Sequence, residues 1–116
     1  MPSLHASSPK PERLDRLFVA LADGHRRAMV DRLAYGAMSV SDLAKSLAIA
    51  LPSAVKHLAV LEAGGLVESH KVGRVRTFRI APDAFNDLEA WVAERKAMWN
   101  HQLDALDALL QEQDQP

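Results

Sequence analysis

Apolar residues recur at helical spacing over most of this 116-residue chain. The first such stripe follows an i, i+3, i+4, i+7 pattern and consists of Leu14, Leu17, Phe18 and Leu21. Similar stripes predict short helices over residues 25–35, 40–47 and 52–64. We therefore expect the first half of the chain to be helical, with each helix burying one face.

The third and fourth of these helices are separated by a short connector, residues 48–51. Ser39 and Asp42 have the spacing of a capping box, in which the serine hydroxyl accepts a hydrogen bond from the N–H three residues later. Pro52 suits the first turn of the next helix, where no N–H is needed. Two helices joined so closely predict a helix-turn-helix.

The pattern changes period after Gly64-Gly65. Residues 66–72 and 75–80 are rich in β-branched and apolar side chains, with Gly73-Arg74 between them, which predicts a β-hairpin with basic residues near its tip. A last helix is predicted over residues 83–112. Its apolar seam consists of Phe85, Leu88, Val92, Trp99, Leu103, Leu106 and Leu110. This is more apolar surface than a small domain covers, so a partner helix is expected.

Length and composition predict one domain in three stretches: a loose polar arm over residues 1–11, a core over 12–82 and the long helix over 83–113. The absence of cysteine excludes disulfides and thiolate metal sites. The chain has neither an apolar run long enough to span a membrane nor a signal-peptide pattern, so we expect no membrane partner and a cytoplasmic location.

The net charge of −1 hides an uneven distribution. Residues 1–50 carry a net charge of +2, residues 51–80 carry +3, and residues 81–116 carry −6. A basic middle and an acidic tail suit a protein that meets phosphate with one end only, although uneven surface charge also arises without function.

The predicted helix over 52–64 has the chemistry of a recognition helix for the DNA major groove, because one face is apolar and the other carries small and polar groups. Its candidate contact residues are Leu51, Ser53, Val55, Lys56 and His57. The hairpin adds Lys71, Arg74 and Arg76, cations suited to phosphate or to a narrow minor groove. Taken alone, the polar face of the helix is also typical of a solvent-exposed helix surface. The basic hairpin alone is also typical of an edge hairpin whose charges prevent aggregation.

Four segments resemble the ArsR family of winged-helix repressors in order and spacing. They are LADGHRR (21–27), MSVSDLA (38–44), KHLAVLEAGGLV (56–67) and GRVRTFRI (73–80). The resemblance covers about residues 12–112. It implies a mainly α fold with a β-hairpin, a homodimer through the first and last helices, and an inverted-repeat DNA operator that the protein usually represses. The expected dimer contacts are Leu14, Leu17, Trp99, Leu103, Leu106 and Leu110.

The chain departs from the family at its metal sites. Where metal-sensing members have a Cys-x-Cys pair, this chain has Ser39 and Ser41. Some members bind zinc between their last helices; here His101 and Asp104 form a half site, but Leu88 and Ala90 occupy the positions of the other half. We therefore expect no metal or other cofactor there.

For Arg26 and Arg27, the same resemblance suggests a structural ion pair for one and a phosphate contact for the other. A catalytic function is not expected, because no nucleophile motif, phosphate-binding glycine loop or dinucleotide fingerprint is present. The alternative to a DNA-binding regulator is a winged helix that binds another protein through its long helix and hairpin.

Overall fold

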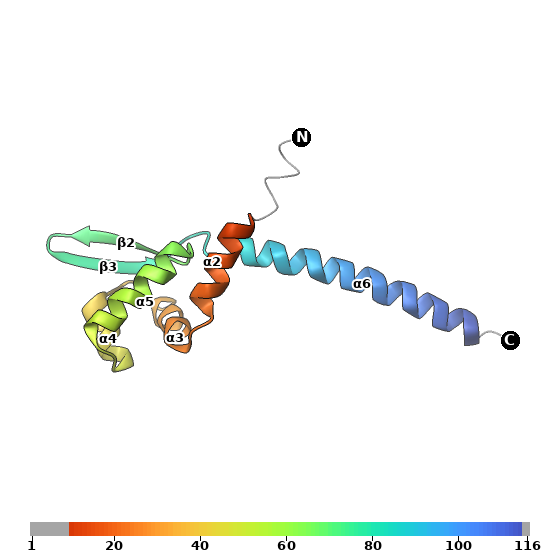
Figure 1. Ribbon diagram of the computed structural model, residues 1–116, viewed down its shortest axis with the longest axis horizontal. Coiled ribbons are helices and arrows are strands. Elements are labelled where there is room, and N and C mark those ends of the chain that lie inside the picture. Colours follow the sequence, from red (N-terminus) through yellow and green to blue (C-terminus); the bar gives the residue numbers. More distant parts are fainter. Residues whose placement is uncertain (1–9, 115–116) are drawn as a thin grey trace, which may run out of the picture.

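The computed structural model describes residues 10–114, so residues 1–9 of the predicted arm lie outside the described residues. A body of short helices and a small sheet carries one long helix that extends away from it, giving overall dimensions of 75 × 37 × 22 Å (Figure 1). The elements are α2 (Pro11–Leu21), α3 (Gly24–Leu33), β1 (Met38–Ser39), α4 (Val40–Leu47), α5 (Leu51–Ala63), β2 (Val67–Val72), β3 (Val75–Ile80) and α6 (Asn86–Asp114).

The helix boundaries follow local chemistry. Pro11 opens α2, so the first helix includes the last residue of the predicted arm. The Asp42 N–H donates to the Ser39 hydroxyl at 3.1 Å, which confirms the predicted cap of α4. The last helix begins at Asn86 and not at Asp83, because residues 82–85 form turns first.

The sheet has three antiparallel strands in the order β1-β3-β2, one more than the sequence predicted. The extra strand β1 pairs Met38 with Phe78 and Ser39 with Thr77. Two residues are too few to show an alternating pattern, so this strand could not be predicted from periodicity. The predicted hairpin is confirmed, with Val72 opposite Val75 and Gly73 at a φ of +63° in the turn.

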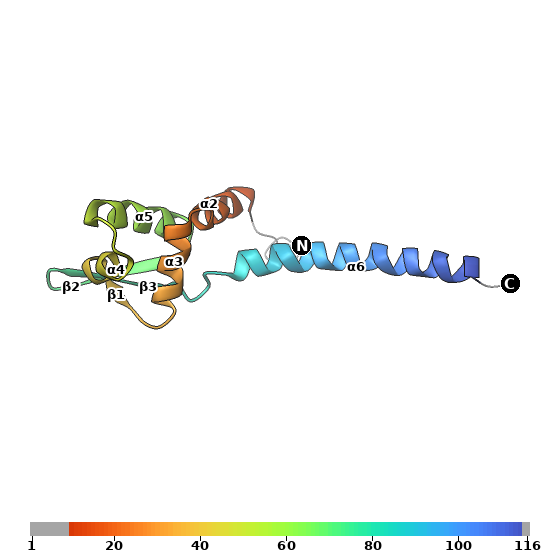
Figure 2. The same ribbon diagram turned by 90° about the horizontal axis from the view of Figure 1, so that it is seen from below.

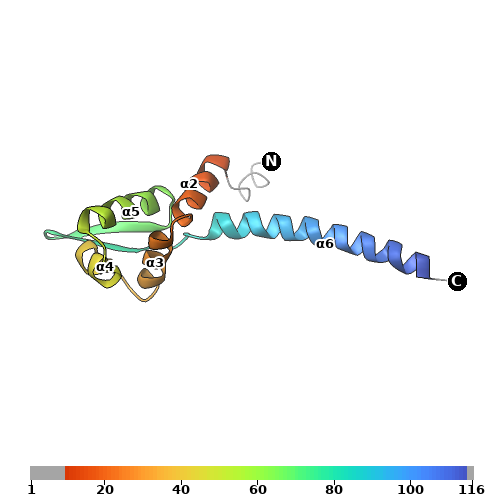
Figure 3. The ribbon, with the colours of Figure 1, turned by 60° about the horizontal axis from the view of Figure 1, so that its bottom comes forward.

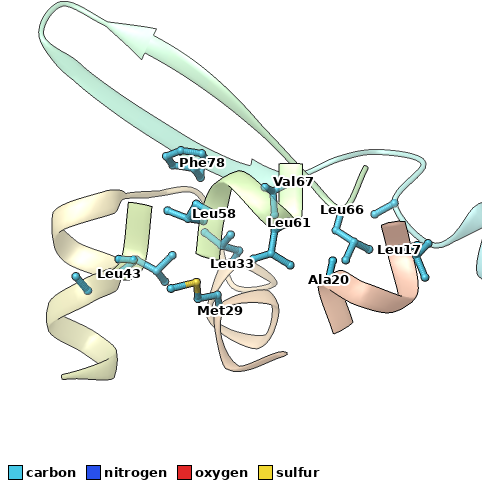
Figure 4. Packing of buried hydrophobic residues seen from close by; sticks show 13 residues of the cluster. Leu17, Ala20, Met29, Leu33, Leu43, Leu58, Leu61, Leu66, Val67 and Phe78 are labelled. Atoms are coloured by element: carbon cyan, nitrogen blue, oxygen red, sulfur yellow. The ribbon is translucent and has the colours of Figure 1, made fainter. Parts of the chain in front are cut away.

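The core lies between the sheet and the helices α2 to α5 (Figure 4). Its buried side chains include Leu17, Ala20, Met29, Leu33, Leu43, Leu58, Leu61, Leu66, Val67 and Phe78. The expectation that Leu14 and Leu17 form a dimer interface is wrong, since both are buried within the chain and Leu17 is only 2% exposed. Within the chain, the apolar stripe of α2 packs mainly on α5, while Phe18 remains 40% exposed.

The long helix α6 contacts the body only near its start (Figure 2). Arg13 of α2 pairs with Asp87 at 3.0 Å, and the rings of Phe18 and Trp91 meet edge to face at 5.6 Å. The later turns of α6 leave large apolar side chains exposed, including Met98, Trp99, Leu103, Leu106, Leu109 and Leu110. Exposed apolar residues at this density are typical of an interaction surface.

No single helix among residues 10–114 is long and apolar enough to cross a membrane. The pair α4 and α5 would reach the required length and composition together, but the two helices are bent by 110°. Several apolar side chains of this pair, such as Leu43, Leu58 and Leu61, are already buried in the core.

Candidate nucleic-acid interface

The helices α4 and α5 form the predicted helix-turn-helix, with residues 48–50 as the turn (Figure 3). Ala48 adopts a left-handed conformation, with a φ of 54°. Its N–H closes the end of α4 by bonding to the Lys45 carbonyl at 3.2 Å. Ala50, which precedes α5, provides no side-chain cap, as its methyl group predicts.

The left-handed turn at Ala48 leads to a first prediction. A side chain in this conformation costs about 1–2 kcal/mol, which glycine avoids while losing somewhat more entropy on folding. Ala48→Gly is therefore expected to raise the free energy of unfolding by about 0.5–1 kcal/mol in urea titrations. The matched control is Ala59→Gly, in the exposed interior of α5, which should lower it by about 1 kcal/mol. Equal losses in both variants would contradict strain at Ala48.

The two faces of α5 differ as predicted. Ala54, Leu58 and Leu61 are fully buried. On the outer face, the structure brings together four of the predicted contact residues, all exposed: Leu51, Ser53, Val55 and Lys56. A helix fixed to a core by one face, with small and polar groups on the other, can enter the major groove and reach base edges.

The placement of His57 among the DNA contacts is wrong. Its side chain is only 20% exposed, and its Nδ1 lies 3.3 Å from the Arg26 guanidinium and 3.9 Å from the Asp23 carboxylate. The ring therefore faces the start of α3 and not the outer surface of α5. This contact could not be predicted from local sequence patterns, because Arg26 lies 31 positions earlier in the chain.

Arg26 and Arg27 both bind the end of α2. The Arg26 side chain donates to the carbonyls of Ala20 and Val19, each at 2.8 Å, and Arg27 donates to the Leu21 carbonyl at 2.7 Å. Each cation thus binds carbonyl groups in the last turn of α2, where the negative end of the helix dipole favours a positive charge. Hydrogen bonds to carbonyls take the place of the ion pair that the resemblance suggested for one of them.

Asp23 caps α3 beside these arginines, accepting a hydrogen bond from the Arg26 backbone N–H at 3.1 Å. That hydrogen bond lowers the pKa of Asp23 below its ordinary value, partial desolvation opposes the shift, and the charges of His57 and Arg26 add to it. The carboxylate therefore stays ionised at neutral pH and helps to fix the start of α3.

The hairpin formed by β2 and β3 projects beyond the helices (Figure 1). Lys71 and Arg76 are cross-strand neighbours near its tip, and Arg74 lies in the turn itself. Arg76 donates to the Ser69 hydroxyl at 2.8 Å, which in turn donates to the Glu62 carboxylate of α5 at 3.1 Å. This chain of hydrogen bonds links the hairpin to the candidate recognition helix, and it was not predicted.

The base of the hairpin carries a separate ion pair. Arg79 donates to the Glu68 carboxylate at 2.6 Å, and His70 lies 3.6 Å from the same carboxylate. The hydrogen bond from Arg79 lowers the pKa of Glu68, with desolvation opposing and the nearby charges adding to the shift. Arg79 is therefore engaged within the chain. Among the described residues, by contrast, Arg74 and Lys71 form no side-chain hydrogen bond or ion pair.

A helix-turn-helix with a flanking antiparallel hairpin defines a winged helix-turn-helix protein. Residues 21–70 match the family described as "Helix-turn-helix domain". The chain is 46% identical to the ArsR family transcriptional regulator RHA00566, whose crystal structure superposes with a TM-score of 0.74 over 80% of this chain and 96% of that one. The chain belongs to the ArsR family of transcriptional regulators.

Two mycobacterial proteins extend the comparison. The HTH-type transcriptional regulator Rv2034 of Mycobacterium tuberculosis is 43% identical over 68 residues, which are 59% of this chain and 64% of Rv2034. The homodimeric winged helix-turn-helix DNA-binding domain of Mb0332 from Mycobacterium bovis is 31% identical, with a TM-score of 0.62 over 81% of this chain and 84% of that domain. The chain thus spans just under two thirds of Rv2034.

Proposed function

We propose that this protein represses transcription by binding an inverted-repeat operator in double-stranded DNA as a homodimer. The observation that carries the proposal is the outer face of α5, where Ser53, Val55 and Lys56 are exposed. The adjoining hairpin adds Lys71 and Arg74, which form no side-chain hydrogen bond or ion pair among residues 10–114. Ser53 offers a hydroxyl to a base or a phosphate, Val55 offers methyl contacts to thymine, and Lys56 suits guanine or phosphate. The hairpin cations suit phosphates or a minor groove.

The dimer in this proposal forms through α6. Its 29 residues span about 44 Å at 1.5 Å each, and its outer turns expose Trp99, Leu103, Leu106 and Leu110. The Mb0332 domain, which is homodimeric, supports the same assembly here. A two-fold dimer would place two copies of α5 in successive major grooves, about one helical turn apart.

We further propose a cytoplasmic location, without a membrane partner, and a binding function without catalysis. The cytoplasmic location is supported by the need of a transcriptional regulator to reach chromosomal DNA. The binding function without catalysis is supported by the sequence, which lacks a nucleophile motif and phosphate-binding loops. A winged helix used only to bind another protein is the competing interpretation.

The proposal is tested by selecting genomic DNA fragments with the purified protein and measuring their affinity by fluorescence anisotropy. We expect one inverted-repeat sequence to be enriched, with an affinity that falls steeply as salt rises, by about 0.9 log units per phosphate contact for each tenfold increase. Unrelated duplexes should bind more weakly, by a factor of about 1,000 or more. The absence of salt-dependent binding to any duplex would favour the protein-binding alternative.

The hairpin makes a separate prediction. Arg74→Ala should weaken binding to all duplexes by a similar factor, about tenfold, and reduce the salt slope by about 0.9 for each lost phosphate contact. Arg79→Ala is the matched control, because Arg79 lies at the base of the same hairpin and is paired with Glu68. If Arg79→Ala weakened binding as much as Arg74→Ala, the tip of the hairpin would not be the contact.

A further inference from the structure

Three side chains with metal-ligand chemistry meet where the turn between α2 and α3 packs on α5. Asp23 caps α3, His25 lies in its first turn, and His57 lies in the middle of α5. One potential ligand atom of each lies within 4.8 Å of those of the other two, and the two imidazole rings are 5.7 Å apart. We propose that these residues, the Asp23–His25–His57 cluster, bind a divalent transition-metal ion such as Zn²⁺ and that the bound ion changes the affinity for DNA.

The donor set favours this class of ion. Two imidazoles and one carboxylate are typical ligands of Zn²⁺, with bonds of about 2.0–2.2 Å, whereas Ca²⁺ and Mg²⁺ prefer oxygen ligands alone. Ligands in a tetrahedral zinc site lie about 3.4 Å apart, so atoms separated by up to 4.8 Å need to close by up to about 1.4 Å. His25 is exposed in the first turn of α3, so its ring can make this movement without disturbing the core.

Arg26 is the group that competes with the ion, because its guanidinium lies 3.3 Å from the His57 Nδ1. This contact is the longest of the side-chain hydrogen bonds of Arg26. The other two hold the guanidinium to the carbonyls of Ala20 and Val19 at 2.8 Å. Arg26 therefore stays anchored when His57 turns to a metal ion, and the negative charge of Asp23 offsets the repulsion between the two cations.

A metal ion at this cluster would act on the proposed recognition helix. His57 follows Lys56 directly, and its ligation would tie the middle of α5 to the start of α3. Fixing α5 in one position changes the free energy of placing its outer face in the major groove. By linkage, the ion must change the DNA affinity by the same factor by which DNA changes the ion affinity. This half of the inference rests on the proposed function, and the metal site itself does not.

The site is tested first without DNA, by titrating the full chain with Zn²⁺ against a chromophoric chelator and recording the absorption spectrum with Co²⁺. We expect one ion per chain and a tetrahedral Co²⁺ spectrum. His25→Ala should weaken binding by roughly 100-fold, since the loss of even an outer-shell partner costs 10–100-fold. His101→Ala, which removes an exposed histidine of α6, is the matched control and should bind as the original chain does.

His25 makes no side-chain hydrogen bond among the described residues, so its replacement should leave the fold intact, which circular dichroism would check. Equal zinc affinity in His25→Ala and the unmodified chain, or no zinc binding at all, would overturn the site. Loss of binding in His101→Ala alone would place the ion on α6 and overturn it equally.

The regulatory half is tested by repeating the DNA titration with and without Zn²⁺. The affinity of the unmodified chain for its selected operator should change by about fivefold or more, and that of His25→Ala should not. Zinc binding with an unchanged DNA affinity would overturn the regulatory half while leaving the site. Failure to bind DNA in either state, with zinc binding intact, would instead reject the proposed function.

Discussion

Leu103→Asp is expected to convert the proposed dimer into monomers. Leu103 is 56% exposed in the single chain and lies on the same face of α6 as Trp99, Leu106 and Leu110. In a two-fold dimer the substitution would bury two carboxylates in this apolar seam, and desolvation costs several kcal/mol for each ion. A cost of about 4 kcal/mol corresponds to a dissociation constant about 1,000-fold higher, which sedimentation equilibrium would measure.

The matched control is Ala108→Asp. It adds the same charge and a slightly larger loss of helix propensity to the same helix, but five residues away and hence on the opposite side. We expect Ala108→Asp to remain dimeric. A dimeric Leu103→Asp variant would show that the protomers meet through another surface. Loss of the dimer in both variants would point to unfolding of α6, which circular dichroism would reveal.

The Leu103→Asp variant also allows the contribution of dimer formation to DNA affinity to be measured apart from that of base recognition. The outer face of α5 and the hairpin are unchanged in Leu103→Asp, so affinity for a single half-site should stay within about twofold of the original, a difference of under 0.5 kcal/mol. Affinity for the full inverted repeat should fall steeply, because the second α5 no longer binds as part of the same molecule. Weakening at the half-site by the same factor would contradict α6 as a module for dimer formation alone.

The sequence predicted those parts of the fold that depend on local patterns. The capping group of Ser39 and the glycine turn of the hairpin are set by neighbours within a few residues. The buried face of α5 follows from the spacing of Ala54, Leu58 and Leu61. The same patterns predicted which side chains of α5 point outward, with His57 as the exception.

The wrong predictions concern contacts between segments far apart in the chain. The stripe with Leu14 and Leu17 shows that one face of α2 is covered, but not whether α5 or a partner covers it. In the same way, the edge position of His57 on α5 does not reveal that Arg26 holds its ring. The chain of hydrogen bonds from Arg76 through Ser69 to Glu62 also depends on how the hairpin folds back against α5. Such contacts are set by tertiary packing, which periodicity does not report.

Gly64 provides the second large effect, because it lies where α5 ends against α2. Its φ of −79° is open to any residue, so conformational freedom is not the reason for glycine here. A Cβ at this position would lie 2.9 Å from both the Ala20 Cβ and the Arg16 carbonyl oxygen. Neither neighbour can turn aside, since one is a fully buried methyl group and the other is helix backbone.

Gly64→Ala should therefore force α2 and α5 apart and lower the free energy of unfolding by about 2–3 kcal/mol, the upper part of the range for an overpacked core. Gly24→Ala is the matched control, because a Cβ there meets only the end of the Arg27 side chain, at 3.8 Å. Its stability should be equal or slightly higher, since alanine favours a helix more than glycine does. Urea titrations of both variants at the same protein concentration measure the difference. Equal stability of the two would show that α2 can move away from α5 at little cost, and the dimer and DNA affinities of Gly64→Ala would then match those of the unmodified chain.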